Sequence, residues 1–252
     1  MTAKIVIQKT SLVDFPGRVS SVFFFPGCNL CCPWCHNRDL VTGEALGLKG
    51  IEDGFSHIKK RREVLGGVVL SGGEPCLQNE LPDFIAEIKK IPLAVKLDTN
   101  GMVPAMLEKL FARKETSPDY ISLDLKIAPA RYEEISPGFF SHKGTMAQCE
   151  KNKQKKNLGD KLIESAALIR KSCIAHEYRT LALPSGFITE SDIEALAPLA
   201  DNSPWYFRPF RGGNSIDPAW DSLEENPGMA KAHTLAFAKK ARELGKNGIC
   251  PD

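Results

Sequence analysis

The sequence predicts an α/β fold, namely a partial (β/α)6 barrel of the TIM type that is open on one side and follows a short N-terminal β extension. Short runs of β-branched and aromatic residues alternate with longer segments of helical spacing, which is typical of parallel βα units. Cysteine-containing or polar motifs follow the first four runs, where a barrel of this type places its functional loops. The alternation alone would also fit a doubly wound sheet.

The predicted strands are short apolar runs that end in polar residues. They span 19–25, 66–70, 93–101, 120–126, 173–183 and 205–212. Before the first of them, Pro16 and Gly17 suit a tight turn between two N-terminal strands. The barrel is therefore expected to cover about residues 19–212 of a single domain that spans 1–252.

The predicted helices have apolar residues three or four positions apart. They span 51–65, 77–91, 103–114, 159–171, 189–200 and 228–245. Residues 129–160 interrupt the alternation and are rich in Lys, Pro and Gly, so we expect a variable, solvated insertion there, with a docking surface for a partner as the alternative. Residues 213–252 are expected to form a C-terminal helical extension.

Composition and charge exclude several classes of protein. The 252 residues are 42% hydrophobic and 25% charged, which is enough to bury a core without disulfides. A net charge of +2 gives no general reason to bind nucleic acid. The N-terminus has no apolar core behind a basic start, and no run approaches the roughly 18 apolar residues of a membrane span. We therefore expect a cytoplasmic protein that binds neither nucleic acid nor membrane.

Half of the eight cysteines lie in the stretch "GCNLCCPWCHN", residues 27–37. Cysteines so close together cannot usefully cross-link distant segments, so in a reducing compartment they indicate a metal site. Two sets of three fit the spacing of a ligand loop. Cys28, Cys32 and Cys35 form C-x3-C-x2-C, whereas Cys31 in place of Cys32 gives C-x2-C-x3-C.

Three kinds of metal site fit these cysteines. A structural zinc ion needs four ligands, and the remaining candidates, Cys31 and His36, each adjoin another candidate ligand and are poorly placed to close a tetrahedron. An electron-transfer [4Fe–4S] cluster needs a distant fourth cysteine, often followed by proline, and Cys250 meets that description. A cubane cluster on three thiolates would leave one iron open for catalysis.

The spacing of the cysteine loop resembles the signature of a known family. C-x3-C-x2-C with an aromatic residue before the last cysteine, here Cys28, Cys32, Trp34 and Cys35, resembles the signature of the radical S-adenosylmethionine (SAM) superfamily. The motif "SGGEP" resembles the Gly-Gly-Glu element of that superfamily. This resemblance implies a [4Fe–4S] cluster on the three cysteines, which would also be the catalytic residues, and Cys31 as the spare.

The later motifs narrow the resemblance. "LDTNG" and "LDLK" resemble strand-end elements of the glycyl-radical-enzyme activases. Together with "EYRTLALP" and "WYFRPFR", they make residues 5–213 similar to the group of anaerobic ribonucleoside-triphosphate reductase activating proteins. The resemblance is strong for the superfamily and weaker for the reductase as the target.

The resemblance also implies which residues contact SAM. They are Trp34, His36, Gly72, Gly73, Glu74, Asp98, Asn100, Asp124, Lys126 and Arg179. The two glycines would let backbone approach the methionine moiety, because a side chain there would obstruct it. Glu74 would accept a hydrogen bond from its amino group. Asp124 and Lys126 are two residues apart, so both point to the barrel interior, and Glu177 and Arg179 repeat this spacing.

The implied activity is reductive cleavage of SAM to a 5′-deoxyadenosyl radical that removes hydrogen from a glycine of a partner enzyme. The glycine loop of the partner would enter the open side of the barrel. The expected partner is anaerobic ribonucleoside-triphosphate reductase, with flavodoxin or ferredoxin as the electron donor. Alternatives are an activase of pyruvate formate-lyase or of another glycyl radical enzyme, a radical SAM enzyme acting on a small molecule, and a non-catalytic iron–sulfur electron carrier.

Overall fold

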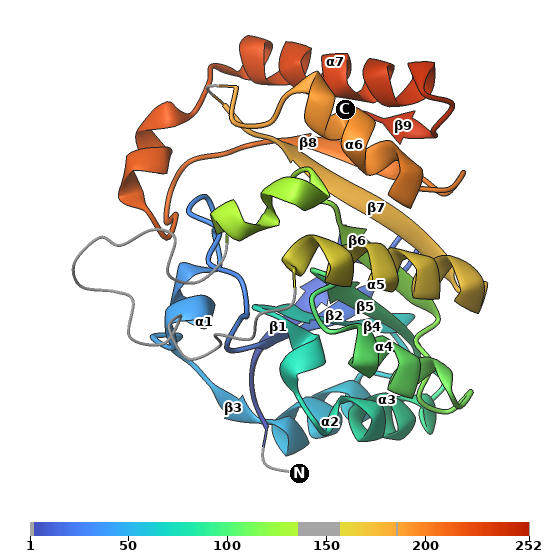
Figure 1. Cartoon of the computed structure of the whole chain (residues 1–252). Coiled ribbons are helices and arrows are strands. Elements are labelled where there is room, and N and C mark those ends of the chain that lie inside the picture. The colour runs from blue at the N-terminus through green and yellow to red at the C-terminus, as the bar shows by residue number, and fades with distance from the viewer. Residues whose placement is uncertain (1–2, 136–156, 185, 252) are drawn as a thin grey trace.

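A computed structural model describes residues 3–135, 157–184 and 186–251 of the chain. Within these ranges, the strands form one sheet in the order β3-β1-β2-β4-β5-β6-β7-β8-β9 (Figure 1). The strands are β1 (Lys4–Ser11), β2 (Ser20–Phe25), β3 (Lys49–Gly50), β4 (Gly67–Gly72), β5 (Ala94–Thr99), β6 (Tyr120–Asp124), β7 (Ala175–Ala182), β8 (Trp205–Pro209) and β9 (Gly248–Ile249). All neighbours from β2 to β9 are parallel, whereas β1 is antiparallel to β2 and to β3.

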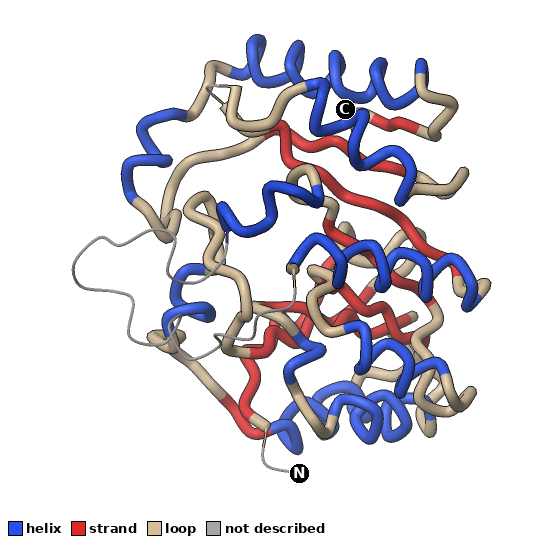
Figure 2. The backbone as a smooth tube through the Cα atoms, viewed as in Figure 1, coloured by secondary structure: helices blue, strands red, loops and turns tan. Residues whose placement is uncertain are grey.

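Helices cover the outer side of the curved sheet, as Figure 2 shows by the blue helices around the red strands. They are α1 (Arg38–Thr42), α2 (Ile51–Lys60), α3 (Leu81–Lys89), α4 (Pro104–Phe111), α5 (Leu158–Ser172), α6 (Glu190–Leu196) and α7 (Pro227–Glu243). Short 3-10 helices are η1 (Pro75–Leu77), η2 (Pro129–Ile135), η4 (Ala197–Leu199) and η5 (Pro218–Leu223). None of the helices in the described ranges is long and apolar enough to cross a membrane.

The predicted fold class is confirmed. A doubly wound sheet reverses its strand order at a switch point, whereas the parallel strands here follow one another in chain order from β2 to β9. The sheet has two edges, β3 and β9, so the barrel stays open. The predicted strands correspond to β2 and β4–β8, and β1 forms the expected extension.

The core follows from the sequence pattern of each element. Helix α2 buries Ile51, Phe55 and Ile58, which are three or four residues apart and therefore share one face. The ring of Phe84 in α3 stacks on that of Phe25 in β2 at a centroid distance of 5.8 Å. Such contacts fix each helix against the outer face of the sheet, and the inner face remains for the site.

The expected insertion at 129–160 needs a correction at its start. Residues 129–135 form η2, in which Tyr132 and Ile135 are fully buried, so this part belongs to the core and is not a solvated segment. Its remainder up to residue 156 lies outside the described residues. The C-terminal extension contains η5 and α7 as helices, and it also adds β9 to the sheet.

Candidate active site

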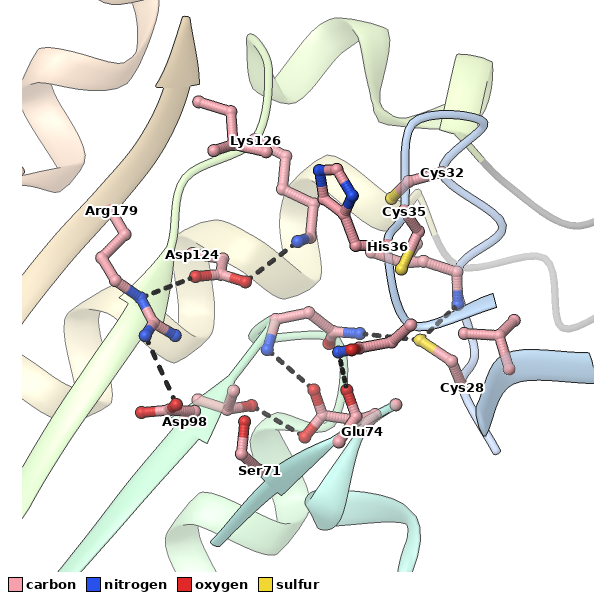
Figure 3. Close-up of a pocket in the computed structure, with 18 of the residues that line it drawn as sticks. Cys28, Cys32, Cys35, His36, Ser71, Glu74, Asp98, Asp124, Lys126 and Arg179 are labelled. Carbon is pink, nitrogen blue, oxygen red and sulfur yellow. Dashed lines mark hydrogen bonds and ion pairs between the residues drawn. The ribbon is translucent and has the colours of Figure 1, made fainter. Parts of the chain in front are cut away.

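A cavity of about 570 Å³ lies at the carboxyl ends of the parallel strands. The cysteine loop between β2 and α1 and the turns after β4, β5 and β6 contribute to it, and β7 and β8 complete its lining (Figure 3). All of the residues predicted as site residues line this one pocket. The structure therefore brings them together, and their individual roles stay predictions.

The cysteine loop separates its four thiols into two groups. Cys28, Cys32 and Cys35 line the pocket (Figure 3). Cys31 does not line it; this residue is 5% exposed and packs with Val41 in a small apolar cluster, which Cys28 and Cys35 contact from the pocket side. The backbone N–H of Cys31 donates to Ile135 O at 3.0 Å, which holds this part of the loop against η2. This separation supports the register that leaves Cys31 as the spare.

The three pocket thiols lie where a negative charge is costly. Burial raises the pKa of Cys32 to about 12, and it also raises the pKa values of Cys28 and Cys35. The Lys126 ammonium opposes this rise at Cys32 and Cys35. Three thiolates can share such a site only with positive charge among them, as metal ions provide.

The geometry favours a cluster over a single ion. Among the described residues, no three His, Cys, Asp or Glu side chains meet closely enough to hold one metal ion. Cys28, Cys32 and Cys35 therefore line one pocket without meeting at a single point. Cys250, the candidate fourth ligand, follows β9 and does not line the pocket.

Glu74 is fully buried and organises the turn after β5. Its Oε1 accepts from the backbone N–H of Cys76 and from Thr99 Oγ1, both at 2.9 Å, and its Oε2 accepts from the N–H of Asn100 at 2.7 Å. Burial raises the pKa of Glu74, and these hydrogen bonds oppose the rise. Both carboxylate oxygens of Glu74 therefore accept hydrogen bonds from within the protein. Through them, the carboxylate joins η1 to the end of β5.

Asn100 extends this connection to the cysteine loop. Its Nδ2 donates to Asn29 Oδ1 at 2.9 Å and lies 3.6 Å from Cys28 Sγ. Its Oδ1 accepts from the N–H of Met102 at 2.9 Å, which closes the turn. The "DTNG" turn thus positions the first pocket cysteine as well as lining the pocket.

The two glycines of "SGGEP" are required by close backbone contacts. Gly72 has φ +124°, and a Cβ there would lie 2.4 Å from the backbone N of Phe25. A Cβ on Gly73 would lie 2.0 Å from the carbonyl oxygen of Gly27. In the structure, Gly72 admits the end of β2 and Gly73 admits the start of the cysteine loop, and the expected approach of the methionine moiety of SAM stays a prediction.

Opposite charges alternate along the inner faces of β6 and β7. Lys126 Nζ lies 2.9 Å from Asp124 Oδ2, and Arg179 Nε lies 3.1 Å from Asp124 Oδ1 (Figure 3). Arg179 Nη1 reaches Asp98 Oδ2 on β5 at 3.3 Å. Burial alone would raise the pKa of Asp124, but the two cations lower it to about 2. The pocket therefore presents fixed charges of both signs.

Sequence reasoning missed the cation that continues this pattern below the pocket. Lys96 on β5 is 1% exposed, and its Nζ lies 2.6 Å from Asp98 Oδ1. A signal was present, because Lys96 and Asp98 are two residues apart, like the two pairs of opposite charge on the following strands. The pocket lining also includes Asp14 and Arg208, which are not among the predicted site residues.

Trp34 and His36 reach the pocket from an aromatic cluster. The Trp34 ring is 3% exposed and lies 5.1 Å from the ring of Phe187 and 5.2 Å from that of Trp220 in η5. His36 is exposed and stacks on Phe210 at a centroid distance of 5.6 Å. The β8 end and η5 thus pack against the cysteine loop and hold these two rings at the pocket.

Comparisons with known proteins agree with this geometry. The model of the radical SAM superfamily matches residues 22–142, the segment that contains the cysteine loop and the strand-end motifs. The chain carries a radical SAM domain. A [4Fe–4S] cluster and SAM are the cofactors of this family, and the three thiols that line the pocket match the cluster in number.

Two curated relatives are activating enzymes by name, and the first is named for glycyl-radical enzymes. A Methanocaldococcus jannaschii protein with that provisional name is 29% identical over 242 residues, which cover 95% of this chain and 89% of that protein. Pyruvate formate-lyase 1-activating enzyme of Escherichia coli is 37% identical over 126 residues, which cover 47% of this chain and 50% of that enzyme. The second match thus spans only half of the relative.

A solved structure shares the fold of this radical SAM domain. Streptococcus suis SuiB bound to S-adenosylmethionine has a TM-score of 0.57 and 12% identity. The likeness covers 92% of this chain and 52% of SuiB. At this identity the likeness concerns the fold alone, and it agrees with an open, mostly parallel barrel.

Proposed function

We propose that the protein is a radical SAM activating enzyme that generates a glycyl radical on a partner enzyme. The observation that carries this proposal is the convergence of three thiols and a set of paired charges in one pocket of an open barrel. When bound, the cluster and SAM supply a 5′-deoxyadenosyl radical. The protein supplies binding, orientation and exclusion of water.

Each group of pocket residues has a task in this proposal. Cys28, Cys32 and Cys35 would hold the cluster, whose remaining iron would be available to SAM. The strand-end charges, including Asp124 and Arg179, receive the amino and carboxylate groups of SAM, because a zwitterion requires fixed partners of both signs. The remaining predicted SAM contacts are Trp34, His36, Gly72, Gly73, Glu74, Asp98, Asn100 and Lys126.

The radical would form on a glycine of a partner enzyme. We propose that this enzyme is anaerobic ribonucleoside-triphosphate reductase. The motif group from the cysteine loop to "WYFRPFR" supports the reductase. The match to pyruvate formate-lyase 1-activating enzyme supports pyruvate formate-lyase as the second candidate. Flavodoxin or ferredoxin in the cytoplasm would donate the electron.

The test is to reconstitute the cluster without oxygen and to add SAM, a reductant and each candidate partner separately. We expect an EPR signal of a glycine-centred radical on one partner, together with 5′-deoxyadenosine. SAM cleavage without a radical on either enzyme would refute the proposed targets and would favour a small-molecule substrate. A reduced cluster whose EPR spectrum does not respond to SAM would refute the SAM reaction itself.

A further inference from the structure

Six charged side chains form one continuous series from the floor of the barrel to the cysteine loop, which we call the charge ladder. In order from the floor, its members are Glu177, Lys96, Asp98, Arg179, Asp124 and Lys126. Anions and cations alternate, and the three charges of each sign cancel. Its upper members line the pocket, whereas Lys96 and Glu177 lie beneath them and do not.

The lower two members are buried and have no route to a ligand. The side chains of Lys96 and Glu177 are 2% and 5% exposed, and their charged atoms lie 3.8 Å apart. Glu177 also accepts from Ser122 Oγ and, at 3.1 Å, from Tyr120 OH. A buried ion pair is weak evidence for stability by itself, because desolvation offsets much of the attraction between the charges. Its position beneath the pocket residues is therefore the informative feature.

Lys96 decides which carboxylates Arg179 contacts. Glu177 and Arg179 are two residues apart on β7 and point to the same face, so Glu177 attracts this guanidinium. Lys96 reaches Glu177 across β6, neutralises it, and holds Asp98 at 2.6 Å. Without the ammonium, Glu177 would compete for the guanidinium, and Asp124 at the pocket would lose its second cation.

We propose that Lys96 and Glu177 are positioning residues that act through Asp98 and Arg179 to fix the charged surface that receives SAM. This inference rests on the proposed function, since it assumes that the pocket binds SAM. It assigns a role to two side chains that do not touch the ligand. It also predicts that SAM binding depends more on the balance between the charges of Lys96 and Glu177 than on either charge alone.

The experiment compares Lys96→Met, Glu177→Gln and the double variant in the cluster-loaded protein. Binding of S-adenosylhomocysteine, which cannot be cleaved, is measured by calorimetry, and the EPR response of the reduced cluster is measured with SAM. We expect each single variant to raise the dissociation constant about tenfold or more, the loss typical when a partner of a binding group is removed. The double variant should recover most of the affinity, because its remaining four charges again cancel.

The matched control is Tyr178→Phe, which lies on β7 between Glu177 and Arg179 but points to the other face. Its hydroxyl lies 3.2 Å from His176 Nε2, so the variant loses a buried hydrogen bond without touching the charge ladder. It should unfold more easily in urea and bind both compounds like the wild type. This control separates loss of stability from loss of position.

The outcomes distinguish the two proposals. A wild-type cluster that does not respond to SAM would refute the proposed function. A responsive wild type with Lys96→Met binding as tightly as Tyr178→Phe would overturn the positioning role. If Lys96→Met does not fold, the double variant provides the test. A stable double variant that binds S-adenosylhomocysteine as weakly as Glu177→Gln would also overturn the positioning role.

Discussion

One added methyl group tests the contact between the turn after β4 and the cysteine loop. In Gly73→Ala, the new Cβ would lie 2.0 Å from the carbonyl oxygen of Gly27 and 2.6 Å from its carbonyl carbon. Both are backbone atoms, so no flexible side chain can move away. Overpacking typically costs about 1–3 kcal/mol. The same carbonyl accepts from the N–H of Glu74 at 2.9 Å, and losing that bond adds about 1 kcal/mol.

We therefore expect Gly73→Ala to lower the free energy of unfolding by about 2–4 kcal/mol, measured by urea denaturation of the cluster-free protein. Because Gly27 precedes Cys28, the shift should also lower the iron content after reconstitution. The control is Gly228→Ala in the first turn of α7, where the nearest contact is 3.4 Å away. It should leave stability unchanged or raise it by up to about 1 kcal/mol. A Gly73→Ala protein with wild-type stability and full iron would refute the reasoning.

Three further substitutions test the ligand register, the pocket charges and the flank of the barrel. Cys31→Ser should retain iron and SAM cleavage, whereas serine at any of the three proposed ligands should abolish both; loss of iron in Cys31→Ser would make the register wrong. The pKa of Asp124 is lowered to about 2, so the ionised carboxylate stabilises the folded protein by up to about 2 kcal/mol. This stabilisation is complete above about pH 4 and is lost as the pH falls from about 4 to 2. The unfolding free energy of the cluster-free wild type should fall more steeply over that range than that of Asp124→Asn, and equal slopes would contradict the ion pairing. Arg131→Met should lower the free energy of unfolding in urea by about 2 kcal/mol. Arg131 Nη1 donates to both oxygens of the 2% exposed Asp192 at 2.8–2.9 Å, and Arg131 is itself only partly buried. An unchanged urea midpoint would contradict this prediction.

The strands were predictable because each one contains a short run rich in apolar residues, which indicates burial. β4 carries a continuous apolar run before its polar end, whereas in β5 apolar residues alternate with Lys96 and Asp98, since helices cover one face and the barrel interior lies at the other. Their order along the sheet also followed from the regular alternation with helices. The pocket motifs come at the ends of those strands, and this explains why the site residues could be chosen before the fold was known.

Two short elements were not predictable for the opposite reason. Helix α1 has five residues, which is too short for a periodic pattern. Helix η5 is fixed by Trp220, whose ring packs against Trp34 far away in the sequence. The local signals of these elements are confined to their ends, such as Gly43 after α1 and Asp217-Pro218 at the start of η5, and these signals do not by themselves predict a helix.

The glycines show a different limit of sequence reasoning. The pattern Gly72-Gly73 correctly indicated a place where backbone must approach something closely. The sequence does not say what approaches, and the structure shows the carbonyl of Gly27 and the backbone of Phe25 there. The residues were thus chosen correctly, and the physical reason became available only with the paired strands.

The charged side of the barrel interior shows that part of such a site is specified within the sequence of each single strand. Inside β2 and β4 the packing is apolar, with Val22 and Val69 against Phe15, whereas β5, β6 and β7 place charges inside. A charge on that face must be neutralised, and the nearest available position is two residues along the same strand. Each of the three strands therefore carries a pair of opposite charges in its own sequence. A search for such i, i+2 pairs on successive strands would have found Lys96, although only the fold reveals that the pairs also neutralise one another.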